Sequence, residues 1–220
     1  MSHKSVSRRN FLKIGCLATA AASMAVCGVG AAIPIDESEV DLPSTFFGGK
    51  NMSNRILVVY ASGLGSTAEI AVEIGKTLET QGIPVDVRPV RENPQIADYQ
   101  AVLLGSAVRH GNWLPEAVEF VKTNQHALND VPVALFTVHI TNLGNDPAST
   151  QARHSFVDQV RSLLHAVDEV YFAGKFDRRG AALMLPDLLA RLIPTMDFRN
   201  FKTVRSWTEN LYPLLAKQVD

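Results

Sequence analysis

Cysteine is nearly absent from this chain of 220 residues and is confined to its N-terminal end. The two cysteines, Cys16 and Cys27, both lie within the first 33 residues. A protein that has lost this segment would contain no thiol, so it would neither need disulfides nor form them in an oxidising compartment. The region after residue 33 therefore cannot form a fold that depends on disulfide bonds.

An excess of positive charge is also missing. The formal net charge is −1, from 21 basic and 22 acidic residues. Four of the basic residues, Lys4, Arg8, Arg9 and Lys13, lie in the first 33 residues, which hold no acidic residue. Without them 17 basic residues remain, and the net charge becomes −5. This acidic balance gives no support for nucleic acid as a partner.

Lysine and arginine are missing from one glycine-rich loop in particular. Residues 56–60 form a short apolar run rich in β-branched side chains, which predicts a strand buried on both faces of a parallel sheet. The loop 62–67, Ser-Gly-Leu-Gly-Ser-Thr, follows directly, and apolar residues at helical spacing continue to Leu78. A Walker-type loop needs Gly-Lys-Ser/Thr, so this loop is not a site for a polyphosphate with magnesium.

The same loop is suited to a single phosphate monoester. A loop between a strand and a helix directs backbone N–H groups and the positive end of the helix dipole at one point. Gly63 and Gly65 permit backbone angles and a close approach that a side chain would prevent. Ser62, Ser66 and Thr67 add hydroxyl groups. We therefore expect a phosphate held by amides and hydroxyls alone.

Two other interpretations of the loop remain open. Residues 66–69 read Ser-Thr-Ala-Glu, which is the pattern of a capping box at an ordinary helix N-terminus. Gly63, Gly65 and Ala68 also fit the dinucleotide fingerprint Gly-x-Gly-x-x-Ala, and Asp86 lies about twenty residues further on. Asp86, however, falls inside the next strand pattern rather than at its end.

The rest of the chain alternates short apolar runs with helical patterns. Further strands are predicted at 84–89, 101–105, 132–138 and 169–173, and helices at 150–165 and 200–216 among others. This alternation indicates an α/β fold with a parallel sheet that helices cover on both faces. Ligands of such sheets lie beyond the carboxyl ends of the strands, so the loops after strands one, three and four should meet there.

The region 55–220 resembles a flavodoxin-type FMN domain. Flavodoxins carry Ser/Thr-x-Thr-Gly-x-Thr after the first strand, and Ser62, Gly65 and Thr67 match this pattern. Leu64 departs from it, because an apolar side chain replaces a threonine hydroxyl. The resemblance implies a flavodoxin-like three-layer sandwich, a five-stranded parallel sheet in the order 2-1-3-4-5, and bound FMN.

Within this superfamily the chain is most similar to menaquinone-dependent protoporphyrinogen dehydrogenases. Residues 105–111, Gly-Ser-Ala-Val-Arg-His-Gly, resemble their Gly-Ala-Ser-Ile-Arg-Tyr-Gly loop, and 136–138, Phe-Thr-Val, resemble their Phe-Ser-Val. Those relatives also carry a long segment after strand five, as this chain does at 174–199. The resemblance implies an FMN-dependent oxidoreductase or electron-transfer protein, with quinone or another membrane acceptor as its redox partner.

The resemblance also implies which residues hold FMN. The phosphate would lie on the first loop, and the isoalloxazine ring would be lined by the second and third loops. The first set is Ser62, Gly63, Leu64, Gly65, Ser66 and Thr67; the others are Ser106, Ala107, Val108, Arg109, His110, Gly111 and Asn112, and Val138, His139, Ile140, Thr141 and Asn142.

Four of the nearby side chains have two interpretations each. Arg109 would stabilise reduced flavin by its charge, or it is solvated or paired with an acidic neighbour. His110 and His139 would shuttle a proton, or each makes a local hydrogen bond. Trp113 would stack on the flavin or anchor the following helix. No residue is assigned a catalytic role, and no metal-ligand spacing joins the histidines.

The segment 181–194 is strongly apolar for a connection between elements. It would either dock on a membrane surface, where quinone is available, or cover the sheet as part of the core. The core interpretation is the preferred one, because apolar helices usually pack against their own domain.

The N-terminus resembles a twin-arginine export signal. Residues 7–13 read Ser-Arg-Arg-Asn-Phe-Leu-Lys, and an Ala/Gly-rich apolar run follows at 14–33. The expected organisation is a signal peptide at 1–33, a linker at 34–54 and the FMN domain at 55–220. The protein would be exported to the periplasm or the outer face of the membrane, or stay anchored by an uncleaved N-terminal helix.

Two further functions remain open. One is a non-catalytic flavodoxin-like module that has lost FMN through Leu64 and its thin third loop. The other is a nicotinamide-dinucleotide enzyme, which requires a different strand order, with Arg88 and Arg91 near the end of strand two suited to a 2'-phosphate. The sequence indicates no oligomeric state.

Overall fold

The computed structural model describes residues 42–48, 54–182 and 187–216. They belong to one of the two units into which the chain divides, Glu37–Asp220. The expected export signal at 1–33 lies outside the described residues. Within the described ranges, no helix has the length and apolar character needed to cross a membrane.

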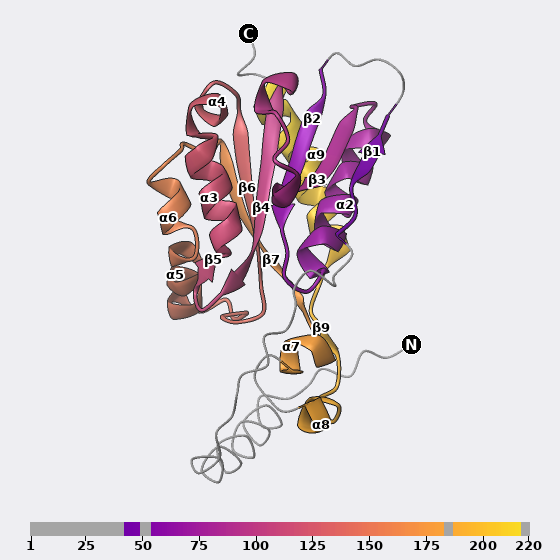
Figure 1. The fold of residues 1–220 in the computed structure, drawn as a ribbon, viewed down its shortest axis with the longest axis vertical. Helices are drawn as coiled ribbons and strands as arrows, with labels where there is room; N and C mark the ends of the chain where they lie inside the picture. The colour runs from indigo at the N-terminus through magenta and orange to yellow at the C-terminus, as the bar shows by residue number, and fades with distance from the viewer. Residues whose placement is uncertain (1–41, 49–53, 183–186, 217–220) are drawn as a thin grey trace. The chain divides into compact units, whose positions relative to one another are not determined.

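Five parallel strands form the central sheet, in the order predicted for a flavodoxin-like fold (Figure 1). The order β3-β2-β4-β6-β7 corresponds to 2-1-3-4-5 along the chain, which confirms the fold class. The bounds are Ile56–Ala61 (β2), Val85–Pro89 (β3), Ala101–Arg109 (β4), Val133–His139 (β6) and Asp168–Ala173 (β7). Every residue of β2 is buried, as its continuous apolar sequence predicts.

Two short antiparallel strands extend this sheet beyond the five that were expected. Strand β1, Thr45–Phe47, pairs with β3 and lies in the stretch expected to be linker. Phe47 explains the pairing, since its ring packs against the core and lies where a side chain at Gly75 would be. The edge of β3 is thereby covered by a very short strand.

The second addition changes the shape of the loop expected at 106–112. Strand β4 continues to Arg109 and turns back into β5, Asn112–Trp113, so this stretch is a hairpin rather than an open loop. His110 and Gly111 both have positive φ, at 52° and 78°. Two such residues between paired strands match the type I′ turn, whose twist suits a hairpin.

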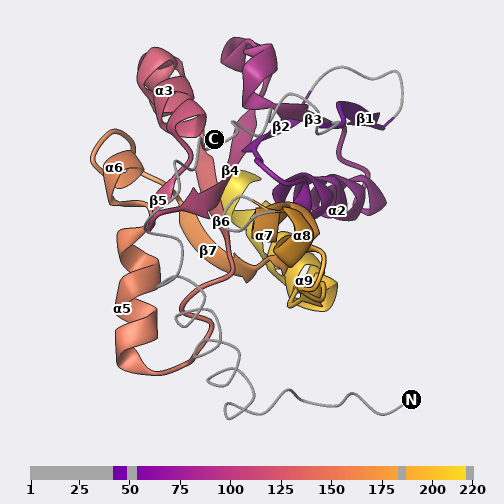
Figure 2. The same ribbon diagram turned by 60° about the horizontal axis from the view of Figure 1, so that its bottom comes forward.

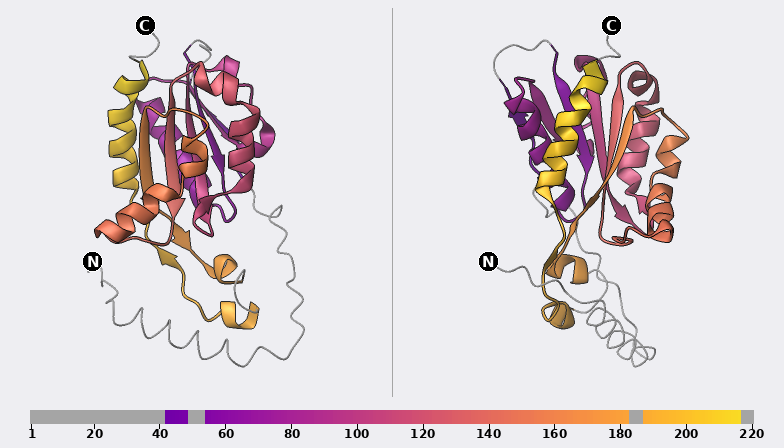
Figure 3. Two further views of the ribbon diagram at one scale, coloured as in Figure 1. Left: turned by 90° about the vertical axis from the view of Figure 1, so that its left-hand side faces the viewer. Right: turned by 180° about the vertical axis from the view of Figure 1, so that it is seen from behind.

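Helices cover both faces of the sheet (Figure 3). One face carries α2, Ser66–Thr80, and α9, Phe201–Ala216, while the other carries α3, Pro115–Thr123, with the short α4, Gln125–Asn129, and α6, Asp158–Arg161. Each face has its own hydrophobic core. Single 3₁₀ turns, Val90–Glu92 (η2) and Ile96–Asp98 (η3), connect β3 to β4.

The helix predicted at 150–165 is divided into two. Helix α5, Pro147–Ser155, ends before Phe156, and α6 begins at Asp158. Phe156 and Val157 are both buried, and the carbonyl of Phe156 accepts the backbone N–H of Trp113 at 3.3 Å. This contact with the β5 hairpin accounts for the break, because a continuous helix would use that carbonyl internally.

A two-stranded arm, residues 174–199, leaves the sheet after β7 and returns to α9 (Figures 1 and 2). Its stem pairs β8, Lys175–Phe176, with β9, Met196–Asp197, and it carries α7, Arg178–Ala182, and α8, Asp187–Ala190. Leu188 and Leu192 are each 76% exposed. The preferred interpretation of 181–194 as core is therefore wrong for these two side chains, although Ala181 and Ala190 are buried.

The contact between β4 and β6 gives a direct test of the packing. A Cβ added to Gly105 would lie 2.0 Å from the Phe136 ring, so Gly105→Ala should destabilise the fold by about 1–3 kcal/mol. Urea unfolding measures this loss. Phe136→Leu in the same chain removes ring atoms from the clash, so the double variant should be more stable than the two single losses together predict. If the losses in free energy of unfolding of the two single variants simply add, Gly105→Ala is accommodated by movements that do not involve the Phe136 ring.

Candidate functional site

A cavity of about 360 Å³ lies at the carboxyl end of the parallel strands. Its volume is within the range of small-molecule sites. Residues at or just after the carboxyl ends of four of the strands line it, and Figure 2 views this end of the sheet. The site is therefore at the switch point of the sheet, where ligands of such folds bind.

Thirteen of the residues expected to hold a ligand line the cavity. They are Ser62, Gly63, Leu64, Ser66, Ala107, Val108, Arg109, His110, Gly111, Val138, His139, Ile140 and Thr141. The lining does not include Gly65, Thr67, Ser106, Asn112 or Asn142. Gly65 and Thr67 nevertheless belong to the loop itself, where Gly65 is the N-cap of α2.

Sequence reasoning missed a fourth wall of the cavity. Leu114 and four residues of the arm, Gly174, Lys175, Phe176 and Gly180, also line it. A signal for the arm was available, because the fifth parallel strand must end at the same edge as the other four. The β8–β9 stem determines which residues after that strand turn back over the cavity. This stem has no sequence motif of its own, so these residues could not be predicted.

The glycine loop 62–65 leaves the start of α2 without a side-chain cap. Gly65 is the N-cap with φ 94°, and among the residues that the structure describes this position makes no side-chain hydrogen bond to the helix start. Its N–H donates instead to the Ser62 Oγ at 3.0 Å, which closes the loop. The capping-box interpretation is therefore wrong, because Glu69 pairs with Arg199 of the arm rather than with the helix start. The first-turn amides remain directed at the loop.

Thr67 carries a polar atom that the fold alone does not satisfy. The side chain is fully buried, and its Oγ1 has no hydrogen-bond partner within the described residues. Leaving a buried hydroxyl unpaired costs about 1–3 kcal/mol. A phosphate oxygen at the loop would satisfy it, so the residues present fit a bound phosphate monoester.

Two arginines reach this cation-free loop from elsewhere in the chain. A Cβ built on Gly63 would lie 2.9 Å from the Arg109 Nη2, which places that guanidinium over the loop. On the arm, the Arg179 Nη2 donates to the carbonyl of Leu64 at 3.0 Å. The folded chain therefore brings two guanidinium groups to a loop that has no cation in its own sequence, and one of them, Arg179, is paired with Asp177 at 3.3 Å. Positive charge near the loop favours an anion.

His139 is buried at the end of β6 and has a defined ring orientation. Its Nδ1 lies 2.7 Å from the carbonyl of Thr141, and since a carbonyl only accepts, Nδ1 carries the proton. Burial lowers the pKa of His139 below its usual 6.5 and Arg153 lowers it further, against an opposing effect of the Thr141 bond. The ring is therefore neutral at pH 7, and Nε2 is a hydrogen-bond acceptor. His110, by contrast, is exposed in the hairpin turn.

The remaining side chains of the hairpin serve the fold. The Trp113 indole N–H donates to the Thr137 Oγ1 at 2.9 Å, and the side chain is buried. Ser106 Oγ accepts the backbone N–H of Leu114 at 3.1 Å. Trp113 does not line the cavity, so of its two interpretations the structure supports that of an anchor for α3.

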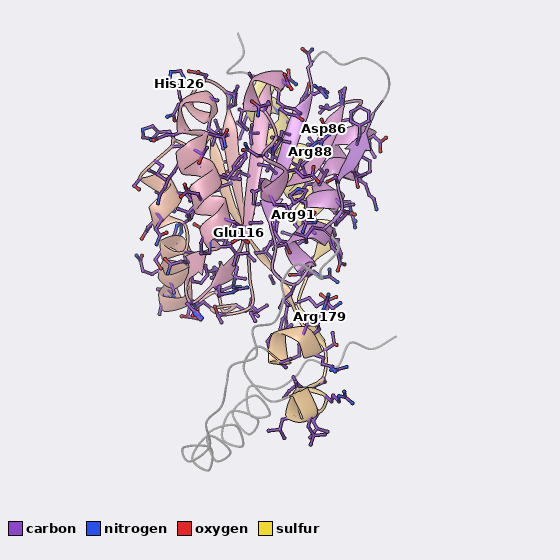
Figure 4. The ribbon with its side chains drawn as sticks, in the orientation of Figure 1. Asp86, Arg88, Arg91, Glu116, His126 and Arg179 are labelled. Atoms are coloured by element: carbon purple, nitrogen blue, oxygen red, sulfur yellow. The ribbon has the colours of Figure 1, made fainter. Side chains whose placement is uncertain are left out.

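The dinucleotide interpretation fails on both the strand order and Asp86. The order found is the flavodoxin one, and Asp86 is buried within β3 (Figure 4). Its carboxylate accepts from the Tyr99 hydroxyl at 2.8 Å and pairs with Arg55 at 3.2 Å. Arg88 pairs with Glu92. Asp86 therefore has a structural role and is not placed to bind a ribose.

Comparison with known proteins decides the family. The model of the family described as "Flavodoxin domain" matches residues 57–184, more than half of the chain. The chain belongs to this family. Similar solved structures of the flavodoxin fold include a flavodoxin from the domain Archaea (16% identity, TM-score 0.45, covering 75% of this chain and 98% of that one). Another is oxidised Flavodoxin 1 from Bacillus cereus (11% identity, TM-score 0.48, covering 76% and 100%).

Among curated proteins, this flavodoxin-family chain is similar to proteins named protoporphyrinogen IX dehydrogenase (quinone). The one from Escherichia coli strain K12 is 33% identical over 88 residues, which are 39% of this chain and 49% of that protein. The one from Leishmania major is 30% identical over 95 residues, or 41% of each chain. The chain spans about half or less of the length of these relatives.

His139 makes a prediction for pH dependence. Because its pKa is lower in the folded than in the unfolded protein, the unfolded state binds the proton more readily. Stability should therefore fall as pH drops below about 6.5, the unfolded value. Urea unfolding between pH 7 and pH 5 should show a shallower loss for His139→Gln than for the wild type. If the two proteins lose stability equally steeply between pH 7 and pH 5, titratable groups other than His139 cause the acid sensitivity.

Proposed function

We propose that this flavodoxin-family chain binds FMN and acts as a redox protein, in electron transfer or as an FMN-dependent oxidoreductase. The observation that supports it most strongly is the buried hydroxyl of Thr67, which has no hydrogen-bond partner within the described part of the chain, at the start of a helix whose N-cap is a glycine. An oxidoreductase with FMN needs such a phosphate anchor together with a cavity for the ring. Both lie at the same end of the sheet.

In this proposal each wall of the cavity has a task. Ser62, Ser66 and Thr67 hold the phosphate with the loop amides, and the apolar residues Val108, Val138 and Phe176 shield the ring from water. FMN supplies electron-transfer chemistry when bound, while the protein places it and tunes its potential. Arg109 and Arg179 add positive charge beside the anion.

His139 and Arg109 would tune the ring rather than the phosphate. A neutral His139 presents Nε2 as an acceptor for an N–H group of a ligand in the cavity. Arg109 also lines the cavity, and its positive charge favours an electron-rich ligand. These two roles follow from the tautomer and the charge, and no step of bond breaking is assigned to either residue.

The electron acceptor in this proposal is a quinone or another membrane-bound carrier. The relatives similar to this chain are named as quinone-linked dehydrogenases of protoporphyrinogen IX, so these two compounds are the first pair to assay. We further propose export through the twin-arginine route, which carries proteins already folded around their cofactors. The signal-like segment 1–33 supports this localisation.

The arm is the part of the chain suited to a membrane surface. Leu188 and Leu192 are largely exposed on the arm, which also lines the cavity. Arg178 and Arg191 lie on the same arm and give it positive charge. Exposed leucines beside arginines match an anionic lipid surface, which the apolar side chains enter while the cations meet the headgroups.

A flavin titration of the full chain tests the proposal. The wild type should take up about one FMN per chain, with quenching of the flavin fluorescence. Thr67→Val should weaken FMN at least about tenfold, since a hydrogen bond to a charged group contributes about 1.5–3 kcal/mol. The same change should leave the FMN-free protein as stable or more stable, because it removes an unpaired buried hydroxyl.

Thr77 provides the matched control for that titration. It is a buried threonine on the same helix, and its hydroxyl already donates to the carbonyl of Glu73 at 2.8 Å. Thr77→Val should leave FMN affinity unchanged and bring no gain in stability. A wild-type protein that takes up no flavin would instead support a non-catalytic flavodoxin-like module.

Vesicle binding tests the membrane contact. Leu188→Asp with Leu192→Asp should reduce binding to vesicles rich in phosphatidylglycerol at least tenfold, because roughly 1.5–3 kcal/mol of burial is lost for each leucine. Leu214→Asp is the control, since Leu214 is an exposed leucine on α9, away from the arm. Sedimentation with vesicles gives the measurement. Unchanged binding of the double variant would exclude the arm as the membrane contact.

A further inference from the structure

The arm contacts the phosphate loop with two different kinds of interaction. Arg179 on α7 donates a hydrogen bond to the carbonyl of Leu64 at 3.0 Å. The next residue, Gly180, lies so close to the Leu64 side chain that an added Cβ would be 3.2 Å from its Cδ1. Figure 2 shows α7 beside the start of α2, and Figure 4 labels Arg179 on it. The two contacts together fix α7 over the loop.

The far end of the arm is attached to the same helix. Arg199, whose side chain is only 7% exposed, pairs with Glu69 in the first turn of α2 and with Asp197 at 2.7 Å. The arm is therefore held at both of its ends against the loop and the helix that follows it. The position of the arm over the loop therefore depends on several separate contacts and not on a single surface ion pair.

Leu64 is the residue at which the loop departs from the flavodoxin pattern. The pattern places a threonine there, and this chain has an apolar side chain in contact with Gly180 of the arm. Compared with the flavodoxin pattern, the loop therefore lacks one hydroxyl that could donate to a phosphate. In its place, the Leu64 side chain packs against α7. That contact brings the Arg179 guanidinium to a loop with no cation of its own.

We propose that Arg179 is a specificity-determining residue that makes the cavity selective for a flavin with a terminal phosphate over the same flavin without one. This inference rests on the proposed function. A phosphate monoester carries a charge of about −1.5 to −2 at pH 7, and a guanidinium has five N–H donors in a planar fork. The Nη2 atom binds Leu64 O and Asp177, which orients the fork at the loop.

Asp177 sets the orientation of this side chain. Its Oδ1 accepts the backbone N–H of Arg179 at 3.0 Å, and its Oδ2 lies 3.3 Å from the Arg179 Nη2. The carboxylate is itself only 17% exposed. Both contacts are made by the Nη2 atom, so the orientation of the guanidinium is already fixed and less side-chain freedom is lost when an anion binds.

The test compares FMN with riboflavin, which differ only in the phosphate. Each is titrated into the full-length protein, with flavin fluorescence as the readout. Arg179→Gln should weaken FMN about tenfold and riboflavin less than twofold, because a charge-assisted contact to the phosphate is lost. Arg179→Lys keeps the charge without the fork and should recover part of the FMN affinity. The loss with Arg179→Gln should shrink at high salt.

Arg178 supplies the matched control. Arg178→Gln makes the same change of charge one residue away on α7 and should leave the preference for FMN within twofold of the wild type. An equal effect of the two variants would overturn the proposal, because it would show a general effect of net charge. Equal weakening of FMN and riboflavin by Arg179→Gln would also overturn it, since Arg179 would then only support the cavity.

Leu64 links the loop to the arm and gives a second, independent variant. If Leu64 seats α7, then Leu64→Ala should weaken FMN, and Arg179→Gln should have a smaller effect in that background than alone. Full additivity would overturn the coupling. A wild-type protein that binds FMN but not more tightly than riboflavin would overturn both the inference and the phosphate loop. A wild type that binds neither flavin would overturn the proposed function itself.

Discussion

Burial of β2 on both faces is the constraint on which the rest of the structure depends. Each of its six residues is buried, so helices must cover both faces, and the neighbouring strands must join through crossovers. The crossover that leaves β2 starts at the glycine loop between its neighbours β3 and β4. The position of the loop, the open start of α2 and the cavity all follow from this one arrangement.

The sequence predicted correctly those strands and loops whose signal is contained in a few consecutive residues. The apolar runs at 56–60, 101–105 and 132–138 became buried strands in the expected order, and the loops after them meet at one edge. The failures depend on contacts between residues far apart in the chain. The break between α5 and α6 needs the β5 hairpin, and the contact of Arg179 with Leu64 joins residues separated by 115 positions.

The capping box illustrates how a sequence motif can fit and still be wrong. Ser66 and Glu69 have the required spacing, yet the helix begins at Ser66 itself and Glu69 pairs with Arg199. A residue at N1 cannot act as the N-cap, and an arginine brought by the arm competes for the carboxylate. The same distant segment thus takes the acidic partner away from the helix start and brings a cation toward the loop.

The two edges of the sheet differ in the feature that disfavours pairing with a further strand. At one edge β1 is only three residues long, too short to template a neighbouring chain. At the other, β7 carries Glu169, which is held by Arg161 at 2.7 Å beside Tyr171. Charged side chains on an edge strand disfavour pairing with another chain. Both edges of the sheet therefore carry a feature that disfavours growth by sheet extension.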